Sequence, residues 1–378
     1  MEIVTYNDSY WFASQQRSIM KAVKINAVLV SGALVLGAMG AGLVATSAGA
    51  AKKPSQKTTT TLKKPKPINL SGVTLNIGDI SEQVELGLVA SGEITPTSTS
   101  GVFSVTGYPF KLDFTQFIAG PQAIAGIVGG SIDVAVSADT PVIFAEAQGV
   151  KFKTIAVVDP NVPGADFSIV LAKNSQITSL SELKGLTISA QTSTINEYFA
   201  LQALASVGLN EHQVTVDNLT PPLAEAALSS GAIQAAVLPE PYVSLEKAAG
   251  LKVLTSGVGF IDGYEFLDAA QSALANPAKA AAIGDLLTLI GKAQQWDAAN
   301  QAALAQQLAT LDSLPLALAT VIITDTIGSF VPINAAVISK TQTEATVFFN
   351  NSELSAPVNA SSIFDARYNS TIAPFVKS

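Results

Sequence analysis

The sequence contains no cysteine and a single histidine, His212. The lack of cysteine excludes disulfide bonds, a thiol nucleophile, a cysteine-based metal site and a lipid-modified cysteine. One histidine argues against a histidine-based metal site or a Ser-His-Asp triad, and we interpret His212 as a solvated turn residue. Because Arg367 is the only arginine after residue 67, we expect no arginine clamp on an anionic ligand. We therefore predict no catalytic residue, no metal and no cofactor.

Charged residues make up only 13% of the chain and are unevenly distributed. Residues 1–67 carry nine Lys/Arg and two acidic residues, whereas residues 68–378 carry 12 Lys/Arg and 27 acidic residues, a net charge of −15. An acidic main body argues against nucleic-acid binding and favours solubility over binding to a membrane surface. With 378 residues, 48% of them hydrophobic, the chain is long enough for two core-bearing domains.

The first 50 residues have the pattern of an export signal. MKAVK at residues 20–24 is positively charged, residues 25–45 are almost wholly apolar, and Ala48 and Ala50 form an A-x-A-like cleavage site. We interpret residues 1–50 as an N-terminal extension and signal peptide, with translation starting at Met1 or Met20. Because about 20 apolar residues can span a bilayer, an uncleaved anchor is the alternative.

Residues 51–67 form a linker with six lysines, three prolines and no acidic residue. Such a segment repels itself and cannot bury apolar surface, so we interpret it as a tether outside the fold. The folded part is then exported, to the periplasm or to the outer face of the cytoplasmic membrane or cell wall.

From Val73 onward, short apolar runs alternate with helical patterns, which predicts βαβ units and parallel sheets. The first strands are predicted at 73–77, 110–114, 132–136 and 152–158. After a break rich in Pro, Gly and Asp, the same order restarts with strands at 167–172, 186–190, 214–219, 234–238 and 252–256. The rest of the chain is predicted to be mainly helical.

This order of elements predicts an α/β protein of two lobes, each a mixed, mostly parallel sheet flanked by helices. Lobe 1 is discontinuous and comprises residues 68–162 and 257–378, and lobe 2, residues 163–256, is inserted within it. The two crossings, near 159–167 and 255–263, contain Gly and Pro and are predicted to form a hinge.

A turn of small and polar residues ends the predicted strand at 132–136. It consists of Ser137, Ala138, Asp139 and Thr140, and a helical pattern follows from Pro141. We expect Thr140 as the N-cap and Pro141 at the first helical position. Ligands of open parallel sheets bind beyond the carboxyl ends of strands, where a helix start offers free amides and a positive dipole end. The turn is therefore a candidate anion site, with an ordinary helix cap as the alternative.

The second lobe repeats this pattern with Gln191, Thr192, Ser193 and Thr194 between a strand and a helix. Thr194 and Glu197 have the spacing of a capping box.

Two further turns offer polar side chains at the ends of strands. GDISEQVE follows the first strand with Asp79, Ser81 and Gln83, and LPEPYVS follows the strand at 234–238 with Glu240 and Tyr242. Ordinary turn chemistry is the alternative interpretation of both.

Four segments, in order, resemble the nitrate/sulfonate/taurine-type substrate-binding proteins of bacterial ABC transporters. They are GDISEQVELGLVASG, AGPQAIAGIVGGSIDVAVSADTPVIFAEAQG, SQITSLSELKGLTISAQTSTINEYFALQALASVGL and ALSSGAIQAAVLPEPYVSLEKAAGLKVL. The similarity extends over about residues 73 to 258. It implies a type II periplasmic-binding-protein fold whose two lobes close on a small ligand, with ABC permease subunits as partners and a monomeric state. The ligand contacts that it implies are Asp79, Ile80, Ser81, Ser137, Ala138, Asp139, Thr140, Gln191, Thr192, Ser193, Thr194 and Glu240.

The sequence departs from the family pattern at three places. Residues 91–103 lengthen the connection after the first helix, Gln-Thr-Ser-Thr replaces a Gly-Ser pair, and Glu240 stands where an aromatic residue is often found. Asp139 and Glu240 disfavour a bare anion such as nitrate or a simple alkanesulfonate. They favour a zwitterion, such as a taurine-like sulfonate, or a neutral heterocycle.

The leading hypothesis is therefore an exported solute-binding protein of an ABC importer rather than an enzyme. Two alternatives remain open. One is an enzyme of the same fold that acts on a pyrimidine or aromatic small molecule, for which Asp139 and Glu240 are the only carboxylates that the sequence places at the site. The other is a tethered extracytoplasmic sensing module.

Overall fold

Residues 68–377 are described by a computed structural model, and the predicted export signal and linker at 1–67 lie outside the described residues. The residues from Asn69 onward belong to one unit. Within the described range, no helix combines the length and the apolar composition that a membrane span requires.

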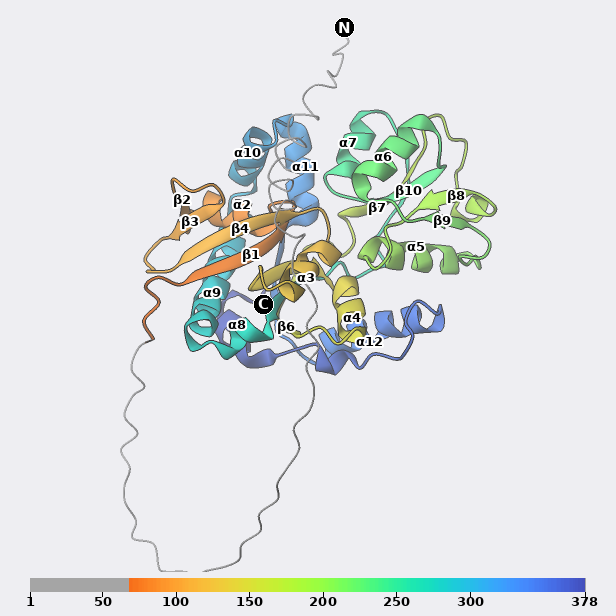
Figure 1. The fold of residues 1–378 in the computed structure, drawn as a ribbon. Coiled ribbons are helices and arrows are strands. Elements are labelled where there is room, and N and C mark those ends of the chain that lie inside the picture. The colour runs from red at the N-terminus through yellow and green to blue at the C-terminus, as the bar shows by residue number, and fades with distance from the viewer. Residues whose placement is uncertain (1–67, 378) are drawn as a thin grey trace, which may run out of the picture. The chain divides into compact units, whose positions relative to one another are not determined.

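The strands form two separate sheets (Figure 1). The larger sheet contains β1 (Thr74–Ile80), β2 (Ile94–Pro96), β3 (Val102–Val105), β4 (Lys111–Phe117), β5 (Val134–Ala138), β6 (Phe152–Pro160), β12 (Glu265–Ala270) and β13 (Gly328–Val331). Its strand order is β13-β6-β12-β5-β1-β4-β3-β2. The smaller sheet contains β7 (Phe167–Leu171), β8 (Thr187–Ser189), β9 (Thr215–Asp217), β10 (Ala235–Pro239) and β11 (Val253–Ser256), in the order β11-β7-β10-β8-β9.

Both sheets are mixed. In the larger sheet β1 pairs in parallel with β4 and β5, and β6 runs in the same direction because both β5 and β6 are antiparallel to β12 between them. In the smaller sheet β8 is parallel to β9 and β10, whereas β7 is antiparallel to β10 and β11. The central strand β5 reads VAVSA and is buried almost throughout, as expected for a strand covered on both faces.

Helices flank both sheets. They are α2 (Gln83–Ala90), α3 (Gly120–Val128), α4 (Asp139–Ala147), α5 (Ile195–Ser206), α6 (Pro221–Ser230), α7 (Tyr242–Ala248), α8 (Gln271–Ala275), α9 (Pro277–Ala299), α10 (Gln301–Leu311), α11 (Leu316–Thr326), α12 (Ala335–Asn350) and α13 (Asn369–Ile372). Helices α5, α6 and α7 contact β10 of the smaller sheet, and α9 contacts β1 and β13 of the larger one. The predicted α/β class is confirmed, and every strand predicted between 73 and 256 is present.

Strands β2, β3, β12 and β13 are not predicted by the sequence pattern. The hairpin of β2 and β3 occupies much of the segment at 91–103 that lengthens the first connection. Strand β12 is concealed by its charged residues, because EFLDAA carries Asp268 in the middle of the larger sheet. The carboxyl group of Asp268 accepts hydrogen bonds from Ser137 Oγ at 2.7 Å and Thr154 Oγ1 at 2.6 Å, which makes a buried acid tolerable there.

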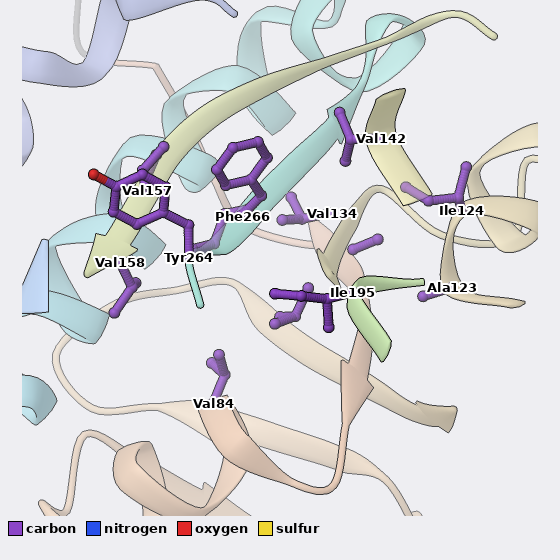
Figure 2. Close-up of a cluster of buried hydrophobic side chains, with 14 of the residues drawn as sticks. Val84, Ala123, Ile124, Val134, Val142, Val157, Val158, Ile195, Tyr264 and Phe266 are labelled. Carbon is purple, nitrogen blue, oxygen red and sulfur yellow. The ribbon is translucent and has the colours of Figure 1, made fainter. Parts of the chain in front are cut away.

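One hydrophobic cluster extends over both sheets. It includes Val134 of β5, Val142 of α4, Phe266 of β12 and Ile195, the first residue of α5 (Figure 2). Because Ile195 follows a strand of the smaller sheet and packs with residues of the larger one, the start of α5 is fixed next to the larger sheet. Helices α4 and α5 are also in contact.

Candidate functional site

Two crossing segments, 161–166 and 257–264, connect the two sheets and lie side by side. A Cβ atom on Gly164 would meet the carbonyl oxygen of Gly257 at 2.5 Å, and one on Gly257 would meet that of Gly164 at 2.8 Å. Gly164 also has a φ of +75°, which L side chains rarely adopt. The backbones therefore touch at a point where only glycine fits on either segment.

The start of α2 is occupied by the carboxyl group of Asp79, the penultimate residue of β1. This group accepts hydrogen bonds from the backbone amides of Ile80 and Glu85, both at 2.9 Å, and of Val84 at 3.1 Å. Burial raises the pKa of Asp79 to about 7, against the lowering effect of these amides. The amides that the sequence assigns to a ligand thus bind a side chain of the protein.

The start of α4 is buried and tied to α12. Helix α4 begins at Asp139, after Ala138, so the expected N-cap Thr140 lies inside the first turn instead. The amide of Thr140 donates to Asp139 Oδ1 at 3.0 Å, a contact between neighbouring residues of the first turn, and the residue before the helix, Ala138, offers no side-chain cap. Pro141 is accommodated in the first turn, where its missing N–H leaves no helical bond unmade. The hydroxyl of Thr140 donates to Glu344 of α12.

Ser137 faces the sheet rather than the helix start. Its hydroxyl donates to Asp268 Oδ2 at 2.7 Å, and its side chain is buried. In the structure it therefore holds β5 to β12.

The start of α5 carries the predicted N-cap, Thr194, whose Oγ1 accepts from the amide of Asn196 at 3.2 Å. Glu197 completes a variant of the predicted capping box, since its Oε2 accepts from the amide of Ser193 at 2.8 Å instead of from that of Thr194. Gln191 accepts from the Thr194 hydroxyl through its carbonyl oxygen at 2.6 Å. Burial raises the pKa of Glu197 to about 7.

The start of α7 is capped in the same manner by Glu240. Its carboxyl group accepts from Ser244, from the hydroxyl at 2.9 Å and from the amide at 3.2 Å. Burial raises its pKa to about 7. All four helix starts that the sequence selects therefore hold an acidic side chain of the chain itself: Asp79, Asp139, Glu197 and Glu240. A ligand anion would have to compete with these carboxyl groups for the same amides.

Three hydroxyl groups in the selected turns are accessible to solvent, unlike the buried hydroxyls of Ser137, Thr140 and Thr194. Ser81 and Thr192 are exposed, Ser193 is half-buried, and their hydroxyls have no hydrogen-bond partner within residues 68–377. Ser81 and Ser193 have φ angles of +53° and +57°. Left-handed backbone at non-glycine residues costs free energy and is concentrated at functional sites, so these positions are the accessible part of the candidate site. Ile80 and Ala138 beside them are half-buried.

Three acidic residues that the sequence pattern does not single out lie near the selected ones. Asp166 lies in the first crossing, and its backbone oxygen accepts from the Glu240 amide at 2.7 Å. Glu265 follows the second crossing and lies opposite Ala138 of β5. Burial raises the pKa of both carboxyl groups to about 8, with further contributions from Asp79 acting on Glu265 and from Glu240 acting on Asp166. The third, Glu344, lies on a helix more than 200 positions from Asp139 and carries no local signal.

No group of three or more His, Asp or Glu side chains between residues 68 and 377 is arranged to hold a metal ion. Most carboxyl groups of the site act in the structure as acceptors for amides at the starts of helices.

The sequence matches the NMT1-like family over residues 79–311. It is 33% identical over 162 residues to an Escherichia coli (strain K12) protein named for the binding of aliphatic sulfonates, an alignment that covers 43% of this chain and 50% of that protein. The chain thus spans about half the length of the curated relative that it matches.

Solved structures of binding proteins share the fold over nearly their whole length. The alkanesulfonate-binding protein SsuA from Xanthomonas axonopodis pv. citri, bound to MOPS, has a TM-score of 0.68 at 23% identity and covers 78% of this chain and 99% of its own. The periplasmic aliphatic sulphonate binding protein SsuA from Escherichia coli has a TM-score of 0.66 at 25% identity, with 77% and 92% covered. The desulfurization enzyme DszB shares the fold at 12% identity and a TM-score of 0.55, with 80% and 99% covered. The predicted periplasmic-binding-protein fold is confirmed.

Proposed function

Because the chain belongs to the NMT1-like family, we propose that it is the exported solute-binding component of an ABC importer. It captures a small organic ligand of the sulfonate or taurine-like class between two lobes and delivers it to a permease. The observation that carries this function is the likeness to sulfonate-binding proteins in sequence and over nearly the whole of two solved structures. The two lobes are the two sheets with their flanking helices, with the boundaries predicted from the sequence.

Ligand capture requires that the two lobes move relative to each other. The crossings at 161–166 and 257–264 supply the hinge, since they are short, lie side by side and meet at Gly164 and Gly257. Two adjacent connecting segments that meet at glycines can change their φ and ψ angles without a clash between side chains.

The ligand contacts are the accessible hydroxyls of Ser81, Thr192 and Ser193 together with the backbone at Ile80 and Ala138. These residues lie at the ends of β1 and β5 of one sheet and after β8 of the other, which supports their assignment to one site between the lobes. A neutral set of donors suits a sulfonate oxygen, because each hydroxyl can donate one hydrogen bond without a full countercharge. The seven buried residues of the predicted set, Asp79, Ser137, Asp139, Thr140, Gln191, Thr194 and Glu240, position these turns.

Isothermal titration calorimetry with a panel of C2–C6 alkanesulfonates, aminosulfonates and pyrimidines tests this function. We expect at least one sulfonate to bind, and Ser193→Ala to weaken that binding by about fivefold to tenfold through the loss of one hydrogen bond. Ser352→Ala is the matched control, because Ser352 also has a positive φ, +63°, but lies after α12 away from the selected turns. Binding of no panel member, or equal effects of the two substitutions, contradicts the assignment.

Catalysis on the same fold is the second candidate, favoured by the likeness to DszB. The chain has no cysteine, so a thiol nucleophile is excluded, and the carboxyl groups of the site are engaged as caps. We therefore infer that the bound ligand is released unchanged. Mass spectrometry of a bound panel member after prolonged incubation checks this, and a new product would establish an enzyme.

A further inference from the structure

The turn between β1 and α2 contains two consecutive residues in the left-handed backbone region. They are Ser81 and Glu82, with φ angles of +53° and +57°, which L side chains rarely adopt. Glu82 is also the residue before α2, and its side chain does not cap the helix. Such a conformation persists only where the surrounding structure fixes it, so the turn requires contacts from outside this pair of residues.

Gln116, the penultimate residue of β4, supplies such contacts. Strands β1 and β4 are parallel neighbours, and their register places Gln116 opposite Asp79. The Oε1 atom of Gln116 accepts a hydrogen bond from the backbone amide of Glu82 at 3.1 Å, and its Nε2 atom donates to Glu85 Oε2 at 3.0 Å. One side chain of the neighbouring strand therefore holds both the second left-handed residue and the first turn of α2.

The contacts of Gln116 complement those of Asp79. The carboxyl group of Asp79 accepts from backbone amides before and after the left-handed pair, whereas the amide of Glu82 within the pair is bound by Gln116. Ser81 lies between these contacts, and its exposed hydroxyl has no hydrogen-bond partner among residues 68–377. The direction in which the Ser81 hydroxyl points is therefore set by side chains that leave the hydroxyl itself free.

We propose that Gln116 is a positioning residue for ligand binding, which holds the turn at Ser81 and Glu82 in the conformation that presents the Ser81 hydroxyl to the ligand. Gln116 acts through Ser81 and does not contact the ligand. This role rests on the proposed solute-binding function, in which Ser81 is a ligand contact. Glutamine suits the role because its amide group both accepts and donates, so it binds an N–H group and a carboxylate at once.

Calorimetry of the full folded protein with ethanesulfonate and hexanesulfonate tests this role. Ser81→Ala should weaken binding by about fivefold to tenfold, as for the loss of one hydrogen bond. Gln116→Ala should weaken binding by about threefold to tenfold, because at most the contribution of Ser81 is lost. The double variant Ser81→Ala/Gln116→Ala should then bind no more weakly than Ser81→Ala alone, a coupling that a merely structural role of Gln116 would not produce.

Gln342 is the matched control, because its side chain also binds the chain on both sides. Its Oε1 atom accepts from the Ala360 amide at 2.9 Å, and its Nε2 atom donates to the Val358 carbonyl oxygen at 3.0 Å. Gln342→Ala should reduce stability to a similar extent as Gln116→Ala and leave the affinity for both sulfonates unchanged.

Reversal of the bond between Gln116 and Glu85 provides a rescue. Gln116→Glu alone places two carboxylates side by side and should weaken binding through the repulsion of like charges. Addition of Glu85→Gln exchanges donor and acceptor, leaves the net charge of the protein unchanged and retains an acceptor for the Glu82 amide. The double variant Gln116→Glu/Glu85→Gln should therefore bind within about twofold of the unmodified protein.

Several outcomes would overturn the positioning role and leave the solute-binding function standing. They are an affinity that Gln116→Ala or Ser81→Ala does not change, additive losses in their double variant, equal losses of affinity in Gln116→Ala and Gln342→Ala, and no recovery in Gln116→Glu/Glu85→Gln. Failure of both sulfonates to bind to the unmodified protein would instead overturn the proposed ligand class, and the role of Gln116 with it.

Discussion

The hydroxyl of Thr140, in the first turn of α4, donates a hydrogen bond to the carboxyl group of Glu344 in the middle of α12. Asp139, the first residue of α4, also hydrogen bonds to Glu344, and burial raises the pKa of both acids above their usual range. Two neighbouring buried acids are tolerated when they share a proton. This contact joins α12 to the start of α4, which the sequence selects as a candidate site.

Substitution of Glu344 should separate its roles as hydrogen-bond partner and as acid. Glu344→Ala removes the acceptor of the Thr140 hydroxyl and the carboxyl neighbour of Asp139, and it creates a cavity, so we expect a loss of about 2–4 kcal/mol in the free energy of unfolding. Glu344→Gln retains a donor and an acceptor and should cost less than about 1.5 kcal/mol. Urea denaturation measures both. Thr343→Ala, on the exposed face of the same helix, is the control and should be nearly neutral.

Because the two crossings are in contact, substitution by alanine should reduce stability by different amounts at two glycines that have the same φ angle. Gly164 and Gly231 both have a φ of +75°, but a Cβ on Gly231 meets nothing within 4 Å. Gly231→Ala should therefore cost only the left-handed backbone, about 1–2 kcal/mol. Gly164→Ala adds the clash with Gly257 and should cost at least about 2 kcal/mol more. Equal losses in thermal denaturation would mean that the crossings are not in contact.

The cap that Asp79 forms on α2 should contribute more to the free energy of unfolding than an ordinary helix cap does. Asp79→Ala removes the acceptor of three amides in a buried position, and we expect a loss of about 2–3 kcal/mol. Asn276 caps the exposed start of α9 by accepting from Ala278 and Lys279. Asn276→Ala should cost about 1 kcal/mol, as is usual for such caps. The comparison is made by chemical denaturation, and a smaller loss for Asp79→Ala would show that its burial outweighs its hydrogen bonds.

Stability should fall as pH rises from acid to slightly alkaline values. Nine buried or partly buried Asp and Glu residues have a pKa that burial raises in the folded protein. The folded state therefore holds their protons more tightly than the unfolded chain does. The stabilisation is fully present below the unfolded pKa of about 4 and is lost as pH passes through the folded values. The groups concerned are Asp139 at about 6, Asp79, Glu197, Glu225, Glu240, Asp268 and Asp297 at about 7, and Asp166 and Glu265 at about 8.

Differential scanning fluorimetry without ligand, from pH 5 to pH 8.5, checks this trend. We expect the unfolding temperature to decrease over this range and the decrease to become smaller in Glu265→Gln, because the variant removes one group that must ionise while buried. An unfolding temperature that increases toward pH 8 would contradict the assignment of raised pKa values.

Local pattern was sufficient to predict nine strands between residues 73 and 256, though not the β2–β3 hairpin. Each of these strands is an apolar run between turn residues, as in IDVAV. Such a run can be recognised from its own residues, without information from the rest of the chain. Strand β12 was missed because Asp268 interrupts the apolar pattern and is compensated by Ser137 and Thr154, which are remote in sequence. The capping role of Thr194 was also predicted correctly, because a helix cap is a local interaction with residues two or three positions away.

The sequence by itself determined the fold class, the order of elements and the turns at which polar residues follow strands, because these depend on neighbours along the chain. Tertiary structure alone decided what those polar residues face. It turned Ser137 into the sheet, placed Glu344 against Thr140, and buried Asp268 between Ser137 and Thr154. Burial and charge at a site are sums over residues that are distant in sequence, and only the folded chain brings them within range of one another.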